Sequence, residues 1–162
     1  MASEQLPIIG ISMGDPAGIG PEICAKTLAL KEIYDMCRPI VVGDAGVMAN
    51  AVRFCGLKLE VAGRRAVSEA RFALGGVDVF DLKNLPLDQL RHKEVTAAQG
   101  RASFEYVAKV IELAMAGVID ATVTGPINKA ASNAVRMAVR SRSARVTRAS
   151  ARNRSRSASV ST

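Results

Sequence analysis

The amino-acid sequence predicts an α/β fold with a mostly parallel sheet and flanking helices. Short apolar segments rich in β-branched residues alternate along the chain with segments of helical character. Glycine-bearing turns follow two of the apolar segments, at Gly14 and Gly125. Strands that alternate with helices return to one sheet in parallel, and the helices cover its faces.

The first strand–helix unit runs from Pro7 to about Leu30. Residues 7–13 form an apolar run that leads into the glycine-rich turn 14–22. Pro21 suits the first turn of a helix, where its missing N–H would have no partner, and Glu22 suits the positive end of the helix dipole. We therefore expect a strand, a tight turn and a helix in succession.

The second unit repeats this order. Residues 38–43 predict a buried strand, Asp44 an N-cap, residues 45–55 a helix, and Gly56 its C-terminal stop. The next part of the chain has a weaker pattern. It predicts strands at 57–62 and 77–80, and loops or short helix at 64–74 and 83–93.

The clearest helical pattern begins at Thr96 and ends at Gly117. One apolar stripe of this helix comprises Phe104, Val107, Ala108, Ile111, Ala114 and Met115, and we expect it to pack. Residues 120–124 predict a short strand, after which Gly125 and Pro126 form a turn and residues 127–131 should begin another helix.

Composition favours an ordinary enzyme domain over a membrane or base-stacking protein. The chain has 162 residues, of which 49% are hydrophobic, and this is enough for a packed core. It contains no apolar run of the ~18 residues that a membrane span needs, and residues 1–5 lack a basic signal region, so we expect a cytoplasmic protein. Aromatic residues make up 4%, too few for a stacking surface. The cysteines Cys24, Cys37 and Cys55 share no CxxC spacing and are expected to be reduced.

The positive charge is concentrated at the C-terminal end. Residues 136–162 contain eight arginines and neither an acid nor a lysine, so removing them takes the formal net charge from +7 to −1. This stretch has no period, glycine or aromatic residue and offers no face to bury. We interpret residues 1–135 as the N-terminal part of a longer α/β fold, and residues 136–162 as a disordered, frameshifted tail. The alternative is a nucleic-acid-binding protein, whose arginine-serine tail would contact phosphates without sequence specificity.

Two loops carry the residues of interest for chemistry. The loop 14–22 has three glycines but lacks the GxGxxG and Walker patterns, so on spacing alone a tight connection and a ligand site are equally good interpretations. Residues 124–129 bring a hydroxyl, an amide and an ammonium together at a second strand end. Lys129 could hold a phosphate or carboxylate there, or could be solvated.

Taken together, the segments at 14–22 and 120–129 resemble the two N-terminal signatures of the 4-hydroxythreonine-4-phosphate dehydrogenase family. They read Gly-Asp-Pro-Ala-Gly-Ile-Gly-Pro-Glu and Asp-Ala-Thr-Val-Thr-Gly-Pro-Ile-Asn-Lys. Residues 41–44 and the helix between Gly100 and Gly117 also stand where that family has them. The resemblance covers about residues 6–135.

The resemblance implies part of an isocitrate/isopropylmalate dehydrogenase-like fold, usually a homodimer. Members oxidise a phosphorylated hydroxy acid with NAD, and a divalent metal polarises the alcohol and then the ketone before CO2 is lost. The implied substrate is 4-phosphohydroxy-L-threonine, in pyridoxine biosynthesis. For a sister branch it is 4-phospho-D-threonate or D-erythronate.

The family's substrate histidine and metal ligands would follow the second signature. Residues 136–143 here contain no histidine, and His92 lies in a polar stretch without a family motif, so we expect it on the surface. By this resemblance, no catalytic residue, metal ligand or NAD contact of the family can be assigned to a residue of this chain. We therefore expect the chain to be inactive by itself. The substrate-binding candidates are Asp15, Gly18, Thr124, Asn128 and Lys129. Asp15 could instead simply cap the turn that follows it.

Overall fold

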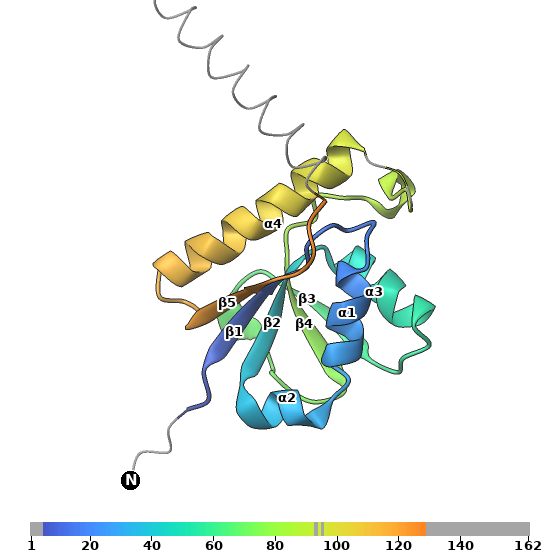
Figure 1. Ribbon diagram of the computed structural model, residues 1–162. Coiled ribbons are helices and arrows are strands. Elements are labelled where there is room, and N and C mark those ends of the chain that lie inside the picture. Colours follow the sequence, from blue (N-terminus) through green and yellow to red (C-terminus); the bar gives the residue numbers. More distant parts are fainter. Residues whose placement is uncertain (1–4, 93, 95, 129–162) are drawn as a thin grey trace, which may run out of the picture.

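The computed structural model describes residues 5–92, 94 and 96–128. It contains one five-stranded sheet in the order β3-β4-β2-β1-β5, and all of its neighbouring strands are parallel (Figure 1). The strands are β1 (Ile8–Ser12), β2 (Arg38–Gly43), β3 (Glu60–Arg64), β4 (Gly76–Asp81) and β5 (Ala121–Thr124). The predicted class, a parallel sheet with flanking helices, is confirmed. The C-terminal tail from residue 136 lies outside the described residues.

The helices divide between the two faces of the sheet. They are α1 (Gly20–Thr27), α2 (Lys31–Met36), α3 (Ala45–Phe54) and α4 (Ala97–Met115), with 3-10 turns at Val67–Glu69 and Leu87–Gln89. Helices α1 and α3 pack together on one face, whereas α4 lies across β2, β1 and β5 on the other (Figure 1). Two apolar clusters result, and α4 contributes residues to both of them. None of the helices that the structure describes is long and apolar enough to cross a membrane.

The first two strand–helix units form as their residues predict, except that α1 ends at Thr27 and not at about Leu30. Pro21 lies at the start of α1, and Glu22 lies in its first turn. Asp44 caps α3, because its Oδ1 accepts hydrogen bonds from the backbone N–H groups of Gly46 at 2.9 Å and Val47 at 3.1 Å. Gly56 ends this unit with a φ of +66°. Strand β2 is buried from Pro39 to Gly43, as expected for the middle of a parallel sheet.

The weaker patterns account for the differences from prediction. Strand β3 begins at Glu60 instead of residue 57, because its first partner is Gly76, the first residue of β4. The short helix α2 was not predicted, and none of its residues is buried. In the predicted helix 127–131, residues 127 and 128 are not helical, and the remaining three lie outside the described part of the chain.

The boundaries of α4 are confirmed, but its expected packing stripe is wrong. Thr96 Oγ1 caps the helix by accepting from the N–H of Gln99 at 3.2 Å, and Gly117 follows its end with a φ of +67°. Phe104 and Met115 of the expected stripe are 45% and 85% exposed. The buried face instead comprises Gln99, Gly100, Ala102, Ser103, Tyr106, Val110 and Leu113. The helix has apolar residues on two sides, and the side that carries Tyr106, Val110 and Leu113 is the buried one.

The cysteines are free thiols: Cys24 is buried, and Cys37 and Cys55 are half-buried. Burial raises the pKa of the Cys24 thiol from its ordinary 9.0 to about 11. The folded protein therefore keeps this proton over a pH range in which the unfolded chain has lost it. The resulting stability is fully present below pH 9 and is lost as the pH rises toward 11.

We expect the free energy of unfolding of the variant Cys24→Ala to fall less steeply than that of the wild type between pH 9 and about 11. The wild-type free energy of unfolding should fall by about 1 to 2 kcal/mol more than that of the variant, since each unit of pKa shift corresponds to about 1.4 kcal/mol. Denaturant unfolding below pH 9 and near pH 11 measures the two slopes. Equal slopes would contradict the assignment of the slope to Cys24.

Candidate substrate-binding site

The two signature loops meet at one edge of the sheet. They follow β1 and β5, which are neighbours because the connection after β4 crosses, through α4, to the other side of β1 (Figure 1). In open α/β sheets, ligands bind at the carboxyl ends of the strands where the strand order reverses in this way. The structure thus brings together loops about a hundred residues apart in sequence.

Backbone hydrogen bonds hold these loops against each other. The N–H of Asp15 donates to the carbonyl of Pro126 at 2.8 Å, and the N–H of Gly125 donates to the carbonyl of Ser12 at 2.8 Å. Gly14 has a φ of +80°, and a Cβ there would collide with the Pro126 carbonyl oxygen. The glycines therefore allow a close approach of one backbone to another.

In the first loop, Asp15 caps the turn that follows it. Its Oδ1 accepts from the N–H of Ala17 at 3.0 Å, and its carbonyl accepts from the N–H of Gly18 at 3.1 Å. The interpretation of Asp15 as the cap of its turn is thereby confirmed. Both Asp15 and Gly18 are half-buried, so part of each remains open to a ligand.

In the second loop, Thr124 is exposed at the end of β5, and Asn128 is half-buried. Lys129, the fifth candidate, lies outside the described residues. The structure thus places Asp15 and Gly18 in the loop that packs against the loop carrying Thr124 and Asn128. Whether they bind substrate stays a prediction.

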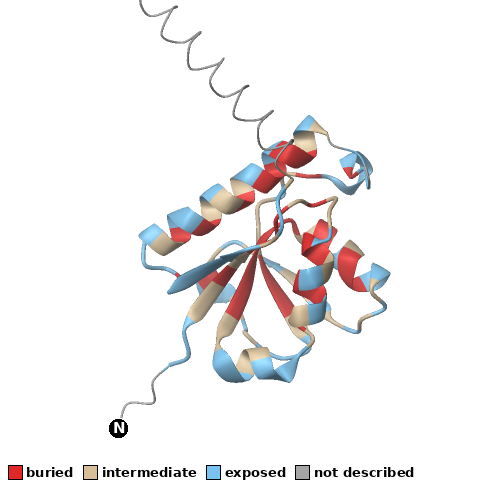
Figure 2. Ribbon diagram, viewed as in Figure 1, coloured by how far each residue is buried: buried red, intermediate tan, exposed pale blue. Residues whose placement is uncertain are grey.

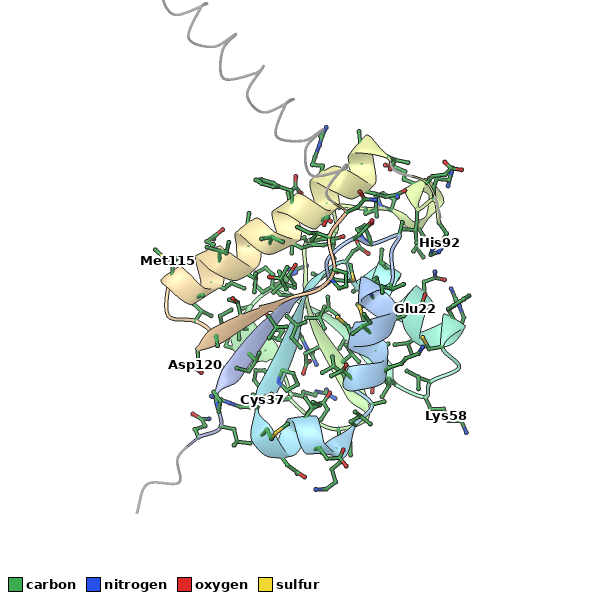
Figure 3. The ribbon with its side chains drawn as sticks, in the orientation of Figure 1. Glu22, Cys37, Lys58, His92, Met115 and Asp120 are labelled. Atoms are coloured by element: carbon green, nitrogen blue, oxygen red, sulfur yellow. The ribbon has the colours of Figure 1, made fainter. Side chains whose placement is uncertain are left out.

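A pocket of about 560 Å³ lies between the first loop and α3. One wall is the α3 stripe Val47, Asn50, Ala51 and Phe54, and the other is formed by residues 16–19, Pro21 and Glu22. His92 lies at this pocket and is exposed, as expected for its surface position. Figure 3 shows His92 and Glu22 on the same side of the molecule. This pocket was not predicted from the sequence, although the apolar spacing of the α3 stripe, interrupted by Asn50, was a possible signal.

Tyr106 lies on the buried face of α4 and is 0% exposed. Burial, together with the carboxylates of Asp44, Asp81 and Glu105, raises the pKa of Tyr106, so its hydroxyl stays protonated. The described residues contain no group of three or more His, Cys, Asp or Glu side chains that could hold a metal ion. The two signature loops present backbone groups, the hydroxyl of Thr124, the amide of Asn128 and the carboxylate of Asp15.

Comparisons with known proteins cover most of this chain. A family model described as pyridoxal phosphate biosynthetic protein PdxA matches residues 35–155. Proteins assigned as D-threonate 4-phosphate dehydrogenases are 48% identical over 131 residues in Symbiobacterium thermophilum and 46% identical over 123 residues in Clostridium botulinum. These alignments cover 81% and 76% of this chain, but 39% and 37% of the relatives.

A solved structure agrees with these matches. The 4-hydroxythreonine-4-phosphate dehydrogenase of Burkholderia phymatum superposes with a TM-score of 0.78 at 40% sequence identity. The match covers 81% of this chain and 39% of that protein. The chain thus spans less than two fifths of the length of these relatives.

The fold and the paired loops define an α/β protein with two signature loops that meet at the carboxyl edge of a parallel sheet. The comparisons with known proteins identify one family within this class. The chain belongs to the family of the pyridoxal phosphate biosynthetic protein PdxA.

Proposed function

We propose that the chain functions as part of an NAD- and divalent-metal-dependent dehydrogenase, and that its paired loops bind a phosphorylated hydroxy acid. The observation that supports this most strongly is the meeting of the two signature loops at the switch point of the sheet. The proposed substrate is 4-phosphohydroxy-L-threonine, because the superposed structure is named for the corresponding dehydrogenase. NAD would accept the hydride and a divalent metal would polarise the reacting oxygen when bound.

The residues described here do not fit the metal, since no set of three ligands is present among them. We therefore assign to this chain binding and orientation of the substrate. Thr124 would donate its hydroxyl proton to a substrate oxygen, and Asn128 would offer its amide. Asp15 would accept from a substrate hydroxyl or ammonium group and would repel the phosphate, so the phosphate should lie away from it.

A second candidate substrate is 4-phospho-D-threonate or the corresponding D-erythronate. It is favoured by the names of the relatives that are 46% and 48% identical to this chain. The compounds differ at the carbon next to the carboxylate. 4-Phosphohydroxy-L-threonine carries an ammonium group there, whereas 4-phospho-D-threonate and 4-phospho-D-erythronate carry a hydroxyl. Calorimetric titration of all three phosphorylated compounds ranks them directly.

The variant Thr124→Val should weaken binding of the preferred compound about tenfold, because one hydrogen bond to a substrate oxygen is lost. The change from Thr to Val nearly preserves shape, and Thr124 is exposed, so the fold should not respond. Titration calorimetry of the full chain measures the effect. Thr122→Val makes the identical change two residues earlier in β5 and should leave the affinity unchanged. Equal affinities of the two variants, or no binding of any of the three compounds, would contradict the proposal.

A further inference from the structure

A second pocket lies over β3 and β4, whereas the signature loops follow β1 and β5 on the other side of the sheet. It has a volume of about 300 Å³. Glu60, Ala62 and Arg64 alternate along β3 and line one wall, and residues of the segment 71–76 line another. In Figure 2 the middle of β4 is buried, whereas the segment that leads into it is exposed or half-buried.

Four charged side chains line this pocket, two of each sign. Arg64 and Asp78 are paired, because Arg64 Nε donates to Asp78 Oδ1 at 2.7 Å. The pair holds the guanidinium of Arg64, whose two terminal nitrogens have no hydrogen-bond partner among the described residues. Glu60 and Arg71 are exposed, and neither side chain has an ion-pair partner in the part of the chain that the structure describes. The pocket thus offers guanidinium N–H donors together with an unpaired carboxylate.

We propose that this pocket binds a free amino acid with an apolar side chain. The carboxylate of the ligand accepts hydrogen bonds from the guanidinium groups of Arg64 and Arg71, whose planar geometry matches it. The ammonium group of the ligand donates to Glu60. The apolar side chain of the ligand lies against Ala62 and Leu74, and Leu74 is 50% exposed.

The balance of charge is the reason for a ligand that carries both signs. The four charged side chains of the pocket sum to zero. A simple anion would be repelled by Glu60, and a simple cation would be repelled by Arg64 and Arg71. A zwitterion with an apolar side chain pairs with both kinds of charge and also covers apolar surface.

Three probes of one shape test the two charged contacts. L-Leucine carries both charged groups, 4-methylpentanoate lacks the ammonium, and 3-methylbutylamine lacks the carboxylate. Titration calorimetry of the full chain should show that leucine binds at least about tenfold more tightly than either analogue, because each analogue leaves a charged side chain unpaired. No binding of leucine, or equal affinities for leucine and 4-methylpentanoate, would overturn the proposal.

Arg71→Gln tests the carboxylate contact. It should weaken the binding of leucine about tenfold, because a charge-assisted hydrogen bond is lost. Arg65→Gln is the matched control, since Arg65 is also exposed but does not line the pocket. It should leave the affinity unchanged, and both variants should melt near the wild-type temperature. Equal affinities of the two variants for leucine would contradict the proposed site.

Glu60→Gln tests the ammonium contact. This variant keeps the shape of the side chain, and it should bind leucine and 4-methylpentanoate with similar affinities, because the partner of the ammonium has lost its charge. A preference for leucine that persists in this variant would overturn the proposal. Thr124→Val should bind leucine as the wild type does, since Thr124 ends β5, away from β3 and β4. Failure of the leucine site is thereby distinguished from failure of the proposed substrate site.

Discussion

Replacing Gly14 by alanine should lower the free energy of unfolding by about 3 kcal/mol or more, and should weaken substrate binding with it. Two penalties add at this position. The φ of +80° is unfavourable for a residue with a Cβ, and that Cβ would meet the carbonyl oxygen of Pro126 and the carbonyl carbon of Gly125, the latter at 2.8 Å. Because these are backbone atoms, relief requires the two signature loops to separate.

Substitutions at Gly75 and Gly125 test the effect of the positive φ and the effect of the steric contact separately. Gly75 has a φ of +89° with no atom within 4 Å of a built Cβ, so Gly75→Ala should cost about 1 kcal/mol from the backbone conformation alone. Gly125 lacks a positive φ, but its Cβ would lie 2.8 Å from the carbonyl oxygens of Ser12 and Met13. Gly125→Ala should therefore resemble Gly14→Ala in its effect on substrate binding. Denaturant unfolding and calorimetry measure both effects, and equal stability losses for Gly14→Ala and Gly75→Ala would contradict the close packing of the loops.

Local patterns were sufficient to predict most strands and helices of this fold. The N-cap at Asp44 and the stops at Gly56 and Gly117 depend on residues within one turn of the helix end, and all three are confirmed. The start of β3 depends instead on where β4 begins, some sixteen residues later. The packing face of α4 depends on which of two apolar sides meets the sheet, and the sequence does not distinguish them.

The candidate site was predictable in its loops but not in its assembly. The signatures at 14–22 and 120–129 were recognisable, whereas their contact depends on β5 pairing with β1, a choice among possible strand orders. The capping task of Asp15 depends on the side-chain rotamer, and for this reason the sequence left it open. The pocket beside His92 combines α1, α3 and the loop after Leu90, and no single segment indicates it.

Asp78 is a second position at which one substitution should have a large effect. Its carboxylate is 7% exposed and accepts from Arg64 Nε at 2.7 Å, from the N–H of Arg71 at 2.9 Å and from the N–H of Phe72 at 2.8 Å. The last bond supports Phe72 at a φ of +50°, where a non-glycine residue is strained. The carboxylate thus fixes the segment between β3 and β4, which the sequence analysis assigned only as a loop or short helix.

The variant Asp78→Ala should lower the free energy of unfolding by about 3 kcal/mol, because the Arg64 side chain, 19% exposed, would lose its partner, and two backbone donors would lose their acceptor. Asp78→Asn should cost less, since its amide oxygen can still accept from the two backbone N–H groups. Asp35→Ala is the control. It breaks the pair of Lys31 and Asp35, whose side chains are 69% and 56% exposed, and should cost under about 1 kcal/mol. If chemical denaturation gives the same loss for Asp78→Ala and Asp35→Ala, the carboxylate does not hold this segment, and burial of Val67 must hold it instead.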